Sequence, residues 1–560
     1  MRDDRGSRAD PVQLIAVAVV LAIAMAAMPF LKGVLIIGKH EGDTLHLADI
    51  VLRMADYGQL PHLDFMTPLG IMSVWPIVLF VKAGLGFGMA FAAAQALVAA
   101  LLIGPILRVA LTRFTGWTAW AYTGFVITMI LALVHGEANA AISLSMHYNR
   151  WAWALAYIAL PLAMLEPLGP RRPWLDGGLI GIAFALMLTV KITYAAAFFP
   201  AVLLALLLRR DFKAILSALI FGVSVMALMT AWLGVEYWAA YLRDLLAVAN
   251  STTRAAPGEP LTGVIASPAY LGGSLALLAT VIFLRQSGRK IEGLVLLLLA
   301  PAFVYVTYQN FGNDPKWLVL VGLLAIGLRP AMGITNSVGW PLRQALLVSG
   351  VIMLALSLPT VLNMTWSPLR LVADNRPNQV PLLSRAKQGQ DVLVSAPRLY
   401  RALVTVPQDG PGEPYAAYAD SYRSKKDDDE DGKASAYDPF VLNGEALPSC
   451  GMSTGYNAWF ETAADDLMQQ GLSGKSVLVA DLFSALWLYG DFKPVEGGAP
   501  WYYSGAPGLE HSDYVLVPLC PTEEARRNDI LKAALAEGWT FDQVARNQIY
   551  ILLKPVPPKS

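Results

Sequence analysis

The sequence predicts an α-helical polytopic membrane protein with about eleven membrane crossings and a C-terminal extracytoplasmic α/β domain. Of its 560 residues, 56% are hydrophobic and only 15% are charged, whereas soluble domains are about half apolar and a quarter charged. Long apolar runs fill residues 1–361, and shorter apolar runs alternate with polar stretches in residues 362–560. We expect these two ranges to be separate domains. The net charge of zero gives no indication of a nucleic-acid partner.

Twelve apolar segments lie in the first domain, and a helix needs about 20 apolar residues to cross a bilayer. Arg2, Arg5 and Arg8 precede the first segment, which predicts a retained crossing that starts in the cytoplasm. The segments are 12–37, 68–81, 88–107, 117–134, 151–165, 177–190, 193–208, 214–233, 267–284, 291–308, 317–328 and 344–361.

Basic clusters assign the sides of the membrane, because cytoplasmic loops carry an excess of Lys and Arg. The clusters are Arg108 with Arg113, Arg171 with Arg172, Arg209 with Arg210 and Lys213, Arg285 with Arg289 and Lys290, and Arg329 with Arg343. All five are cytoplasmic only if segment 68–81, which is short and contains Pro76, does not cross. We therefore expect eleven crossings and one non-crossing segment. The alternative is twelve crossings with a violated charge rule.

This topology predicts a multi-pass protein of the plasma (inner) membrane with four loops outside the cytoplasm. The loops are 38–67, 135–150, 234–266 and 309–316. The first is acidic, and the spacing of its apolar residues predicts a helix over 44–56 with Asp43 at the N-cap. Asp49 and Asp56 are then expected on a solvated face. A carboxylate in this loop suits a general base on an acceptor hydroxyl, or a ligand of a divalent cation.

An acidic residue after the first crossing, a short helix, and Gly58 fifteen residues beyond Asp43 resemble the GT-C glycosyltransferases. The resemblance covers roughly residues 10–330 and extends to the aromatic–Pro entry of the next segment. It implies a sugar donor carried on polyprenyl phosphate, as in protein O-mannosyltransferases and aminoarabinose transferases. It implies transfer with inversion, with Asp43 as the catalytic carboxylate, and we add Glu41 to that role.

The same resemblance leaves a metal requirement open. Many members of the family carry a second acidic residue where this chain has Asn149, and an amide does not supply the same charge. Glu137 or His147, together with Asp43, would then be the ligands of a divalent cation.

Lys191 interrupts an apolar stretch near the outer end of a crossing. A cation there is costly unless it pairs or reaches the headgroups, so we expect it to bind the donor phosphate. Other polar side chains of the outside loops complete the expected substrate site: Asp64, His147, Asn149, Arg150, Arg254, Asn313, Asp314 and Lys316. The structural alternatives are snorkelling for Lys191, an interfacial belt for 147–150, a tight turn for 309–316 and a solvated loop around Arg254.

The second domain has the pattern of a small α/β fold. Strands are expected at 476–481, 513–518 and 548–553, with a helix at 522–537 and a charge run at 424–433. Cys450 and Cys520 are the only cysteines, and they form either a disulfide or two unpaired thiols. Asp481, at a strand end, is either a helix cap or a catalytic acid.

The leading functional hypothesis is transfer of a sugar from a polyprenyl-phosphate carrier to a glycolipid, polysaccharide or protein acceptor at the membrane surface. A transporter or flippase of a lipid-linked saccharide is the second hypothesis, and it needs polar residues near the membrane midplane. The apolar segments are nearly free of such residues. A non-catalytic membrane scaffold is the third.

Overall fold

The computed structural model describes residues 9–136, 139–251, 261–310, 316–406 and 440–558. The chain divides into two compact units. Unit 1 comprises residues 1–44, 68–239 and 255–375, and unit 2 comprises residues 45–67, 240–254 and 376–560. The expected boundary at residue 361 falls inside a helix that continues to Ala373, and the segments 45–67 and 240–254 group with the C-terminal residues.

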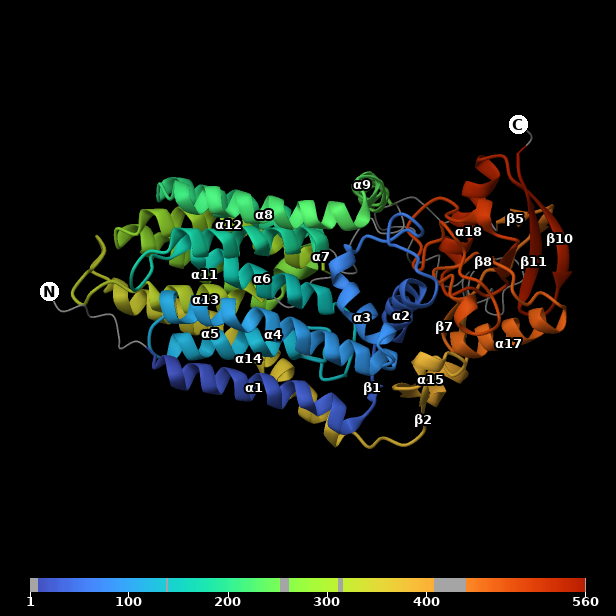
Figure 1. Ribbon diagram of the computed structural model, residues 1–560, viewed down its shortest axis with the longest axis horizontal. Helices are drawn as coiled ribbons and strands as arrows, with labels where there is room; N and C mark the ends of the chain where they lie inside the picture. Colours follow the sequence, from blue (N-terminus) through green and yellow to red (C-terminus); the bar gives the residue numbers. More distant parts are fainter. Residues whose placement is uncertain (1–8, 137–138, 252–260, 311–315, 407–439, 559–560) are drawn as a thin grey trace, which may run out of the picture. The chain divides into compact units, whose positions relative to one another are not determined.

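Unit 1 is a bundle of helices that lie along one another (Figure 1). Its helices are α1 (Pro11–Lys32), α3 (Trp75–Lys82), α4 (Phe87–Arg113), α5 (Trp117–Leu131), α6 (His147–Met164), α7 (Pro173–Leu208), α8 (Phe212–Leu233), α10 (Leu261–Ala266), α11 (Pro268–Gln286), α12 (Lys290–Tyr308), α13 (Trp317–Gly327) and α14 (Leu342–Ala373). The unit also contains the short strand β1 (Leu35–Ile37). Two further helices, α2 (Glu41–Asp56) and α9 (Glu236–Ala249), are divided between the units.

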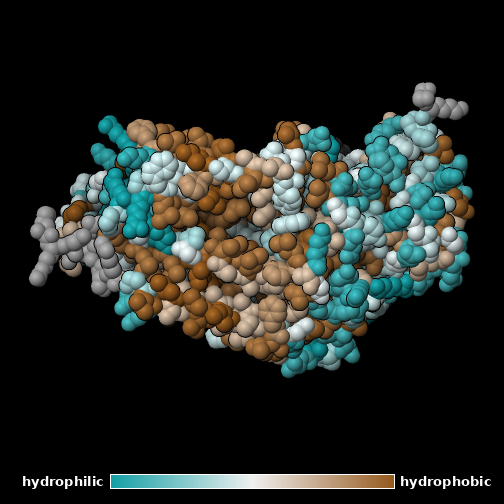
Figure 2. Space-filling model, viewed as in Figure 1, coloured by the Kyte–Doolittle hydropathy of each residue, from teal (hydrophilic) through white to brown (hydrophobic). Residues whose placement is uncertain are grey.

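Seven helices of the described residues are long and apolar enough to cross a membrane: α1, α4, α7, α8, α11, α12 and α14. Helices α5 and α13 are apolar but shorter, with 15 and 11 residues. At 1.5 Å per residue, α13 extends about 16 Å, roughly half of the hydrocarbon core, so its crossing stays a prediction. Figure 2 shows hydrophobic side chains along the sides of the bundle. The polytopic helical class is confirmed.

Helix α7 is a hairpin of two helical arms. Lys191 has φ −158° and ψ 104°, which is extended rather than helical backbone. In a straight helix, Phe184 and Phe199 would be about 22 Å apart, yet their ring centroids are separated by 5.8 Å. The arms therefore run antiparallel and meet at Lys191, as the two separate segments 177–190 and 193–208 predict.

Segment 68–81 does not form a crossing helix. It consists of a 3₁₀ turn at Ile71–Ser73 followed by the eight-residue α3, which extends only about 12 Å. Gly70 packs against the vertex of α7, where its backbone N–H donates to the Val190 carbonyl at 3.3 Å. A Cβ atom on Gly70 would lie 2.1 Å from the Thr189 carbonyl oxygen, so only glycine permits this approach.

The five basic clusters meet at one end of unit 1, the end opposite Lys191. Asp176 accepts from Arg108 at 2.9 Å and from Arg113 at 2.7 Å. Glu292 pairs with Arg209 at 3.0 Å. A single cavity is lined by Arg113, Arg289, Arg329 and Arg343, and Glu166 pairs with Arg171 at 3.6 Å. If segment 68–81 crossed, Arg108 and Arg113 would lie at the other end, so the twelve-crossing alternative is excluded.

Unit 2 contains the α/β fold expected for the C-terminal residues. Its central sheet has the order β10-β11-β9-β8, with β8 and β9 parallel and the other pairs antiparallel. The strands and helices are β2 (Gln379–Pro381), β3 (Val392–Ser395), α15 (Ala396–Tyr400), β4 (Leu403–Thr405), β5 (Val441–Leu442), β6 (Glu445–Ala446), β7 (Gly451–Thr454), α17 (Tyr456–Gln469), β8 (Val477–Val479), β9 (Tyr514–Pro518), α18 (Glu524–Ala536), β10 (Thr540–Arg546) and β11 (Tyr550–Val556).

All four elements predicted for this domain are present as β8, β9, α18 and β11. Apolar residues of the sheet pack on α18, with Val515, Ile551 and Leu531 buried in one cluster. Cys450 and Cys520 form a disulfide that joins positions 70 residues apart. In the chain-entropy model, a loop of that length stabilises the fold by about 4 kcal/mol. The charge run 424–433 lies outside the described residues.

Close packing between the first arm of α7 and α8 generates one prediction. A Cβ atom on Gly181 would lie 2.0 Å from the Ala218 carbonyl oxygen, whereas nothing lies within 4 Å of one on Gly104. We expect Gly181→Ala to force the helices apart and destabilise the protein by roughly 1–3 kcal/mol. Gly104→Ala, the matched control in α4, should leave stability unchanged or raise it slightly. Thermal unfolding in detergent measures both, and equal melting temperatures would contradict the packing described here.

Candidate functional site

The two carboxylates expected to act in catalysis lie in the first turn of α2. The helix begins at Glu41, because the backbone N–H of Thr44 donates to the His40 carbonyl at 3.1 Å. Asp43 is therefore inside the helix, and its assignment as the N-cap of a helix starting at residue 44 was wrong. Glu41 is buried and Asp43 half-buried. The partial positive charge of a helix N-terminus stabilises carboxylates in this position.

Positive charge gathers beside this turn. The rings of His40 and His135 are in contact at a tilt of 36°, with centroids 4.5 Å apart, and His40 Nδ1 lies 3.0 Å from Ser143 Oγ. Burial, followed by nearby positive charges, lowers the pKa of His135 to about 2, so this ring is neutral at physiological pH. The charges that contribute are those of His40, Lys316, Arg150 and Lys39. An electropositive surrounding of this kind favours an anion.

Lys191 is held at the vertex of α7 by side chains from two other helices. Its Nζ atom donates to Asn149 Oδ1 at 3.1 Å and to Asn310 Oδ1. The ammonium also lies 5.2 Å from the centroid of the Tyr148 ring, within the range of a cation–π interaction. Amide oxygens accept hydrogen bonds but carry no net charge. These two contacts fix the position of the ammonium.

Asn310 is itself fixed by two further contacts. Its Nδ2 atom donates to the Val306 carbonyl at 2.6 Å and to the Tyr194 hydroxyl at 3.3 Å. These bonds settle the orientation of the amide, so that Oδ1 faces Lys191. The start of α6, the vertex of α7 and the residues after α12 thus converge on one cation. Sequence reasoning named Lys191 and Asn149, but not Asn310 or Tyr148.

An apolar groove of about 620 Å³ lies along α7. It is lined by both arms of α7 and by α8, including Leu188, Ile192, Phe199 and Leu219. Leu188 and Ile192 flank Lys191 in the chain, so the groove extends to the vertex. Phe199 and Leu219 are more than half exposed at 52% and 60%, which leaves the groove open on its outer side.

Arg150 and His147 hold the protein itself together. Arg150 is fully buried, and its guanidinium donates to the carbonyls of Val134 and Ala132, the latter at 2.8 Å. His147 is buried, and its Nε2–H donates to the Ser73 carbonyl at 2.8 Å. Both were expected to contact substrate, and His147 was also expected to be a metal ligand. The contacts with backbone carbonyls are structural ones, and the expected contacts of both residues with substrate, and of His147 with a metal, stay predictions.

The remaining expected residues divide into three groups. Lys316 is buried, with Nζ 3.5 Å from the Gly136 carbonyl and close enough to His135 to lower its pKa. Asp64 belongs to unit 2 and accepts from the Leu60 N–H at 2.6 Å, which is a turn contact. Outside the described residues lie Glu137, Arg254, Asn313 and Asp314. In the described part of the chain, no three His, Cys, Asp or Glu residues come together to hold a metal.

Asp49 is fully buried in unit 2, and its expected place on a solvated face was wrong. Arg53 makes an ion pair with it, and Trp487 Nε1 donates to its other oxygen at 3.2 Å. Arg53 also donates to the Val495 carbonyl at 2.8 Å. Burial raises the pKa of Asp49, and the neighbouring Arg53 opposes that shift. The i,i+4 spacing of Asp49 and Arg53 was a signal for the pair. Asp56 is exposed, as expected.

Asp481 is a cap in unit 2, one of its two expected roles. Its carboxylate accepts from the backbone N–H groups of Leu482 at 2.7 Å, Thr522 at 2.6 Å and Glu523 at 3.1 Å. The last two groups precede α18, so Asp481 fixes the start of that helix against the end of β8. Burial nevertheless raises the pKa of Asp481 to about 6.

Comparisons with known proteins give two solved structures. Arabinofuranosyltransferase AftD from Mycobacteria is 12% identical, with a TM-score of 0.37 over 99% of this chain and 40% of that one. ArnT from Cupriavidus metallidurans, bound to undecaprenyl phosphate, is 13% identical, with a TM-score of 0.37 over 97% of both chains. No family model and no curated protein matches this chain. Because TM-scores below 0.5 do not establish a shared fold, the function proposed below rests on this chain's own residues.

The titration of Asp481 gives a prediction for stability. A carboxyl group whose folded-state pKa is raised favours the fold when protonated, so its contribution is lost as pH rises through about 6. We expect the protein to lose up to about 3 kcal/mol of stability between pH 4 and pH 8 from this group. Asp481→Asn should flatten that dependence, while the exposed control Asp542→Asn should retain it. Thermal unfolding of the full chain across this pH range tests the difference, and parallel curves for Asp481→Asn and wild type would refute it.

Proposed function

We propose that this protein transfers a sugar from a polyprenyl-phosphate carrier to an extracytoplasmic acceptor. The observation that carries the proposal is the Lys191 ammonium, which two amide oxygens fix at the end of an open apolar groove. A lipid phosphate has the matching chemistry, with an anionic head joined to a long apolar chain. The residues that line the groove are all uncharged.

The donor would bind in two parts. Its prenyl chain would lie in the groove between α7 and α8, where burial of each CH₂ group contributes about 0.8 kcal/mol. Its phosphate would meet Lys191, and Lys316 adds positive charge to the same end of the bundle. Lysine is a compact point charge that suits a phosphate with variable orientation. The amides of Asn149 and Asn310 hold the cation in place before the donor arrives.

The chemistry would be a single displacement. Asp43 would accept the proton of the acceptor hydroxyl, and the hydroxyl oxygen would attack the anomeric carbon of the sugar. The bond between that carbon and the phosphate oxygen would break, with inversion, and polyprenyl phosphate would leave as an anion. Lys191 would stabilise the charge that develops on the leaving oxygen, which is the largest single contribution in many such reactions. Glu41 is the second candidate for the base.

The displacement described above balances in charge without a divalent cation. A metal requirement therefore stays a prediction from the sequence. Of the three ligands expected from the sequence, Glu137 lies outside the described residues and His147 is committed to the Ser73 carbonyl.

One prediction from this mechanism concerns the phosphate leaving group. Lys191→Ala should lower kcat about 100- to 1000-fold, because removal of one group that stabilises an oxyanion has this effect. Lys191→Arg should retain part of the activity, since the charge remains. Lys290→Ala removes an exposed lysine at the start of α12 and serves as the control. Transfer from defined polyprenyl-phosphate sugars to membrane extracts, with mass spectrometry of the product, measures the rates. Full activity of Lys191→Ala would remove this residue from the mechanism.

The second prediction concerns the base. Asp43→Asn keeps the shape of the side chain but cannot take a proton, so turnover should be lost while donor binding and thermal stability are retained. Glu41→Gln, two residues earlier in the first turn of α2, is the matched comparison. If Asp43→Asn turns over normally and Glu41→Gln does not, the catalytic base is Glu41. If both variants are fully active, the proposed mechanism fails.

A further inference from the structure

A second charged site lies at the opposite end of unit 1 from Lys191. It is a cavity of about 510 Å³, here called the arginine pocket, defined by Arg113, Arg289, Arg329 and Arg343. Arg113 binds Asp176 near the start of α7, and the arm from there to Lys191 extends about 22 Å. The arginine pocket is therefore separate from the candidate catalytic site and plays no part in the reaction proposed above.

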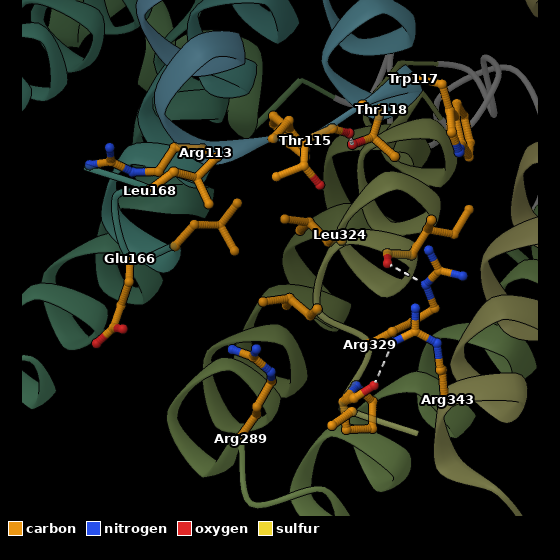
Figure 3. A pocket seen from close by; sticks show the side chains of 18 residues that line it. Arg113, Thr115, Trp117, Thr118, Glu166, Leu168, Arg289, Leu324, Arg329 and Arg343 are labelled. Atoms are coloured by element: carbon orange, nitrogen blue, oxygen red, sulfur yellow. Dashed lines mark hydrogen bonds between the residues drawn. The ribbon is translucent and has the colours of Figure 1, made fainter. Parts of the chain in front are cut away.

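The four arginines of this pocket come from three connections between helices. Arg113 ends α4, Arg289 precedes α12, Arg329 follows α13 and Arg343 lies in the first turn of α14. Figure 3 shows Arg289, Arg329 and Arg343 around one space, with Thr115 and Thr118 facing them. Glu166 is the only acidic residue among those that line the pocket, so its lining has an excess of positive charge.

Two of the four guanidinium groups are not neutralised by their neighbours. Arg113 pairs with Asp176 at 2.7 Å, and Arg289 lies 3.6 Å from Glu292. Arg329 instead donates to the Ile326 carbonyl at 2.7 Å, and Arg343 donates to the Pro330 carbonyl at 3.0 Å. In the part of the chain that the structure describes, neither of these two makes an ion pair with a carboxylate.

The proximity of Arg329 and Arg343 has an energetic cost. Burial, and after it the positive charge of Arg343, lowers the pKa of Arg329. Two guanidinium groups that face one cavity repel each other, and a shared anion between them removes that repulsion. A phosphate group suits this arrangement best, because guanidinium groups bind its oxygens in pairs.

The surroundings indicate that the phosphate belongs to a lipid. The pocket lies where the apolar helices end, and positive charge there is expected on the cytoplasmic side. Trp117, in the first turn of α5, lines the pocket and is 52% exposed. Tryptophan is enriched at headgroup depth, where one side of the ring is apolar and the other wet. A volume of about 510 Å³ exceeds that of a single phosphate and suits a whole headgroup.

We propose that the arginine pocket binds the phosphodiester headgroup of an anionic phospholipid of the cytoplasmic leaflet. Arg329 and Arg343 would hold the phosphate oxygens, and the hydroxyl of Thr115 would donate to the headgroup. Basic pockets between helices on this side of membrane proteins are suited to such lipids. The bound lipid would join helix connections that are distant in the sequence, so it would stabilise this end of the bundle.

Lipid binding to the full-length protein in detergent tests the proposal. Phosphatidylglycerol should raise the melting temperature and remain bound in native mass spectrometry, while phosphatidylcholine should do neither. Arg329→Gln/Arg343→Gln should weaken phosphatidylglycerol binding about tenfold or more. Arg210→Gln/Lys213→Gln removes two exposed charges from the same end without touching the pocket, and it should bind like the wild type.

Two further experiments distinguish a bound lipid from a soluble anion and test the position of the site. Inorganic phosphate should compete only weakly; if it saturates the site and abolishes the preference for phosphatidylglycerol, the ligand is a soluble anion and the lipid proposal is overturned. A photoactivatable phosphatidylglycerol tests the wild type directly, in case the double variant does not fold. It should label peptides that contain residues 113–118 or 329–343. Equal binding by the double variant and wild type, or labelling confined to other peptides, would also overturn the proposal.

Discussion

The bundle depends on the solvation of one ammonium group within an apolar helical unit. Lys191 lies where the two arms of α7 meet, and a charge at that depth is costly unless polar groups replace water. Asn149 and Asn310 provide those groups, and Val306 and Tyr194 in turn orient Asn310. Because these residues come from α6, α7 and α12, one cation fixes three helix ends. The same contacts hold a cation at the vertex of α7, which connects the packing of the bundle to the phosphate chemistry proposed for it.

Charge is segregated to the two ends of unit 1. At one end, arginines from several connections share Asp176, Glu292 and Glu166. At the other end lie Lys191, Lys316 and the first turn of α2. The helices between them present apolar residues along their sides. This separation suits an enzyme that works at a membrane surface on a substrate anchored in lipid, and it explains why the two ends have different ligands in our proposals.

Unit 2 uses part of the acidic loop for its own stability. Residues 45–67 belong to this unit, where Asp49 is buried against Arg53 and Trp487, and Asp64 caps a turn. Each of these carboxylates is satisfied by donors within the unit. The carboxylates of the loop that remain in unit 1 are Glu41 and Asp43, which narrows the choice of base among the described residues. The disulfide between Cys450 and Cys520 and the cap at Asp481 stabilise the α/β fold of the same unit.

The sequence by itself determined the class of fold, the number and order of the apolar segments, and the elements of the C-terminal domain, because hydrophobic runs, basic loops and strand patterns are local properties of the chain. It also singled out Lys191 and Asn149. A lysine within an apolar stretch and a polar residue just before an apolar segment can both be recognised from the sequence alone. Only the tertiary structure showed that Asn310 binds Lys191, that Asp49 is buried, and that Arg150 and His147 serve backbone carbonyls. Those outcomes depend on which residues, distant in the sequence, are brought within hydrogen-bonding distance. A local sequence pattern does not determine which residues these are.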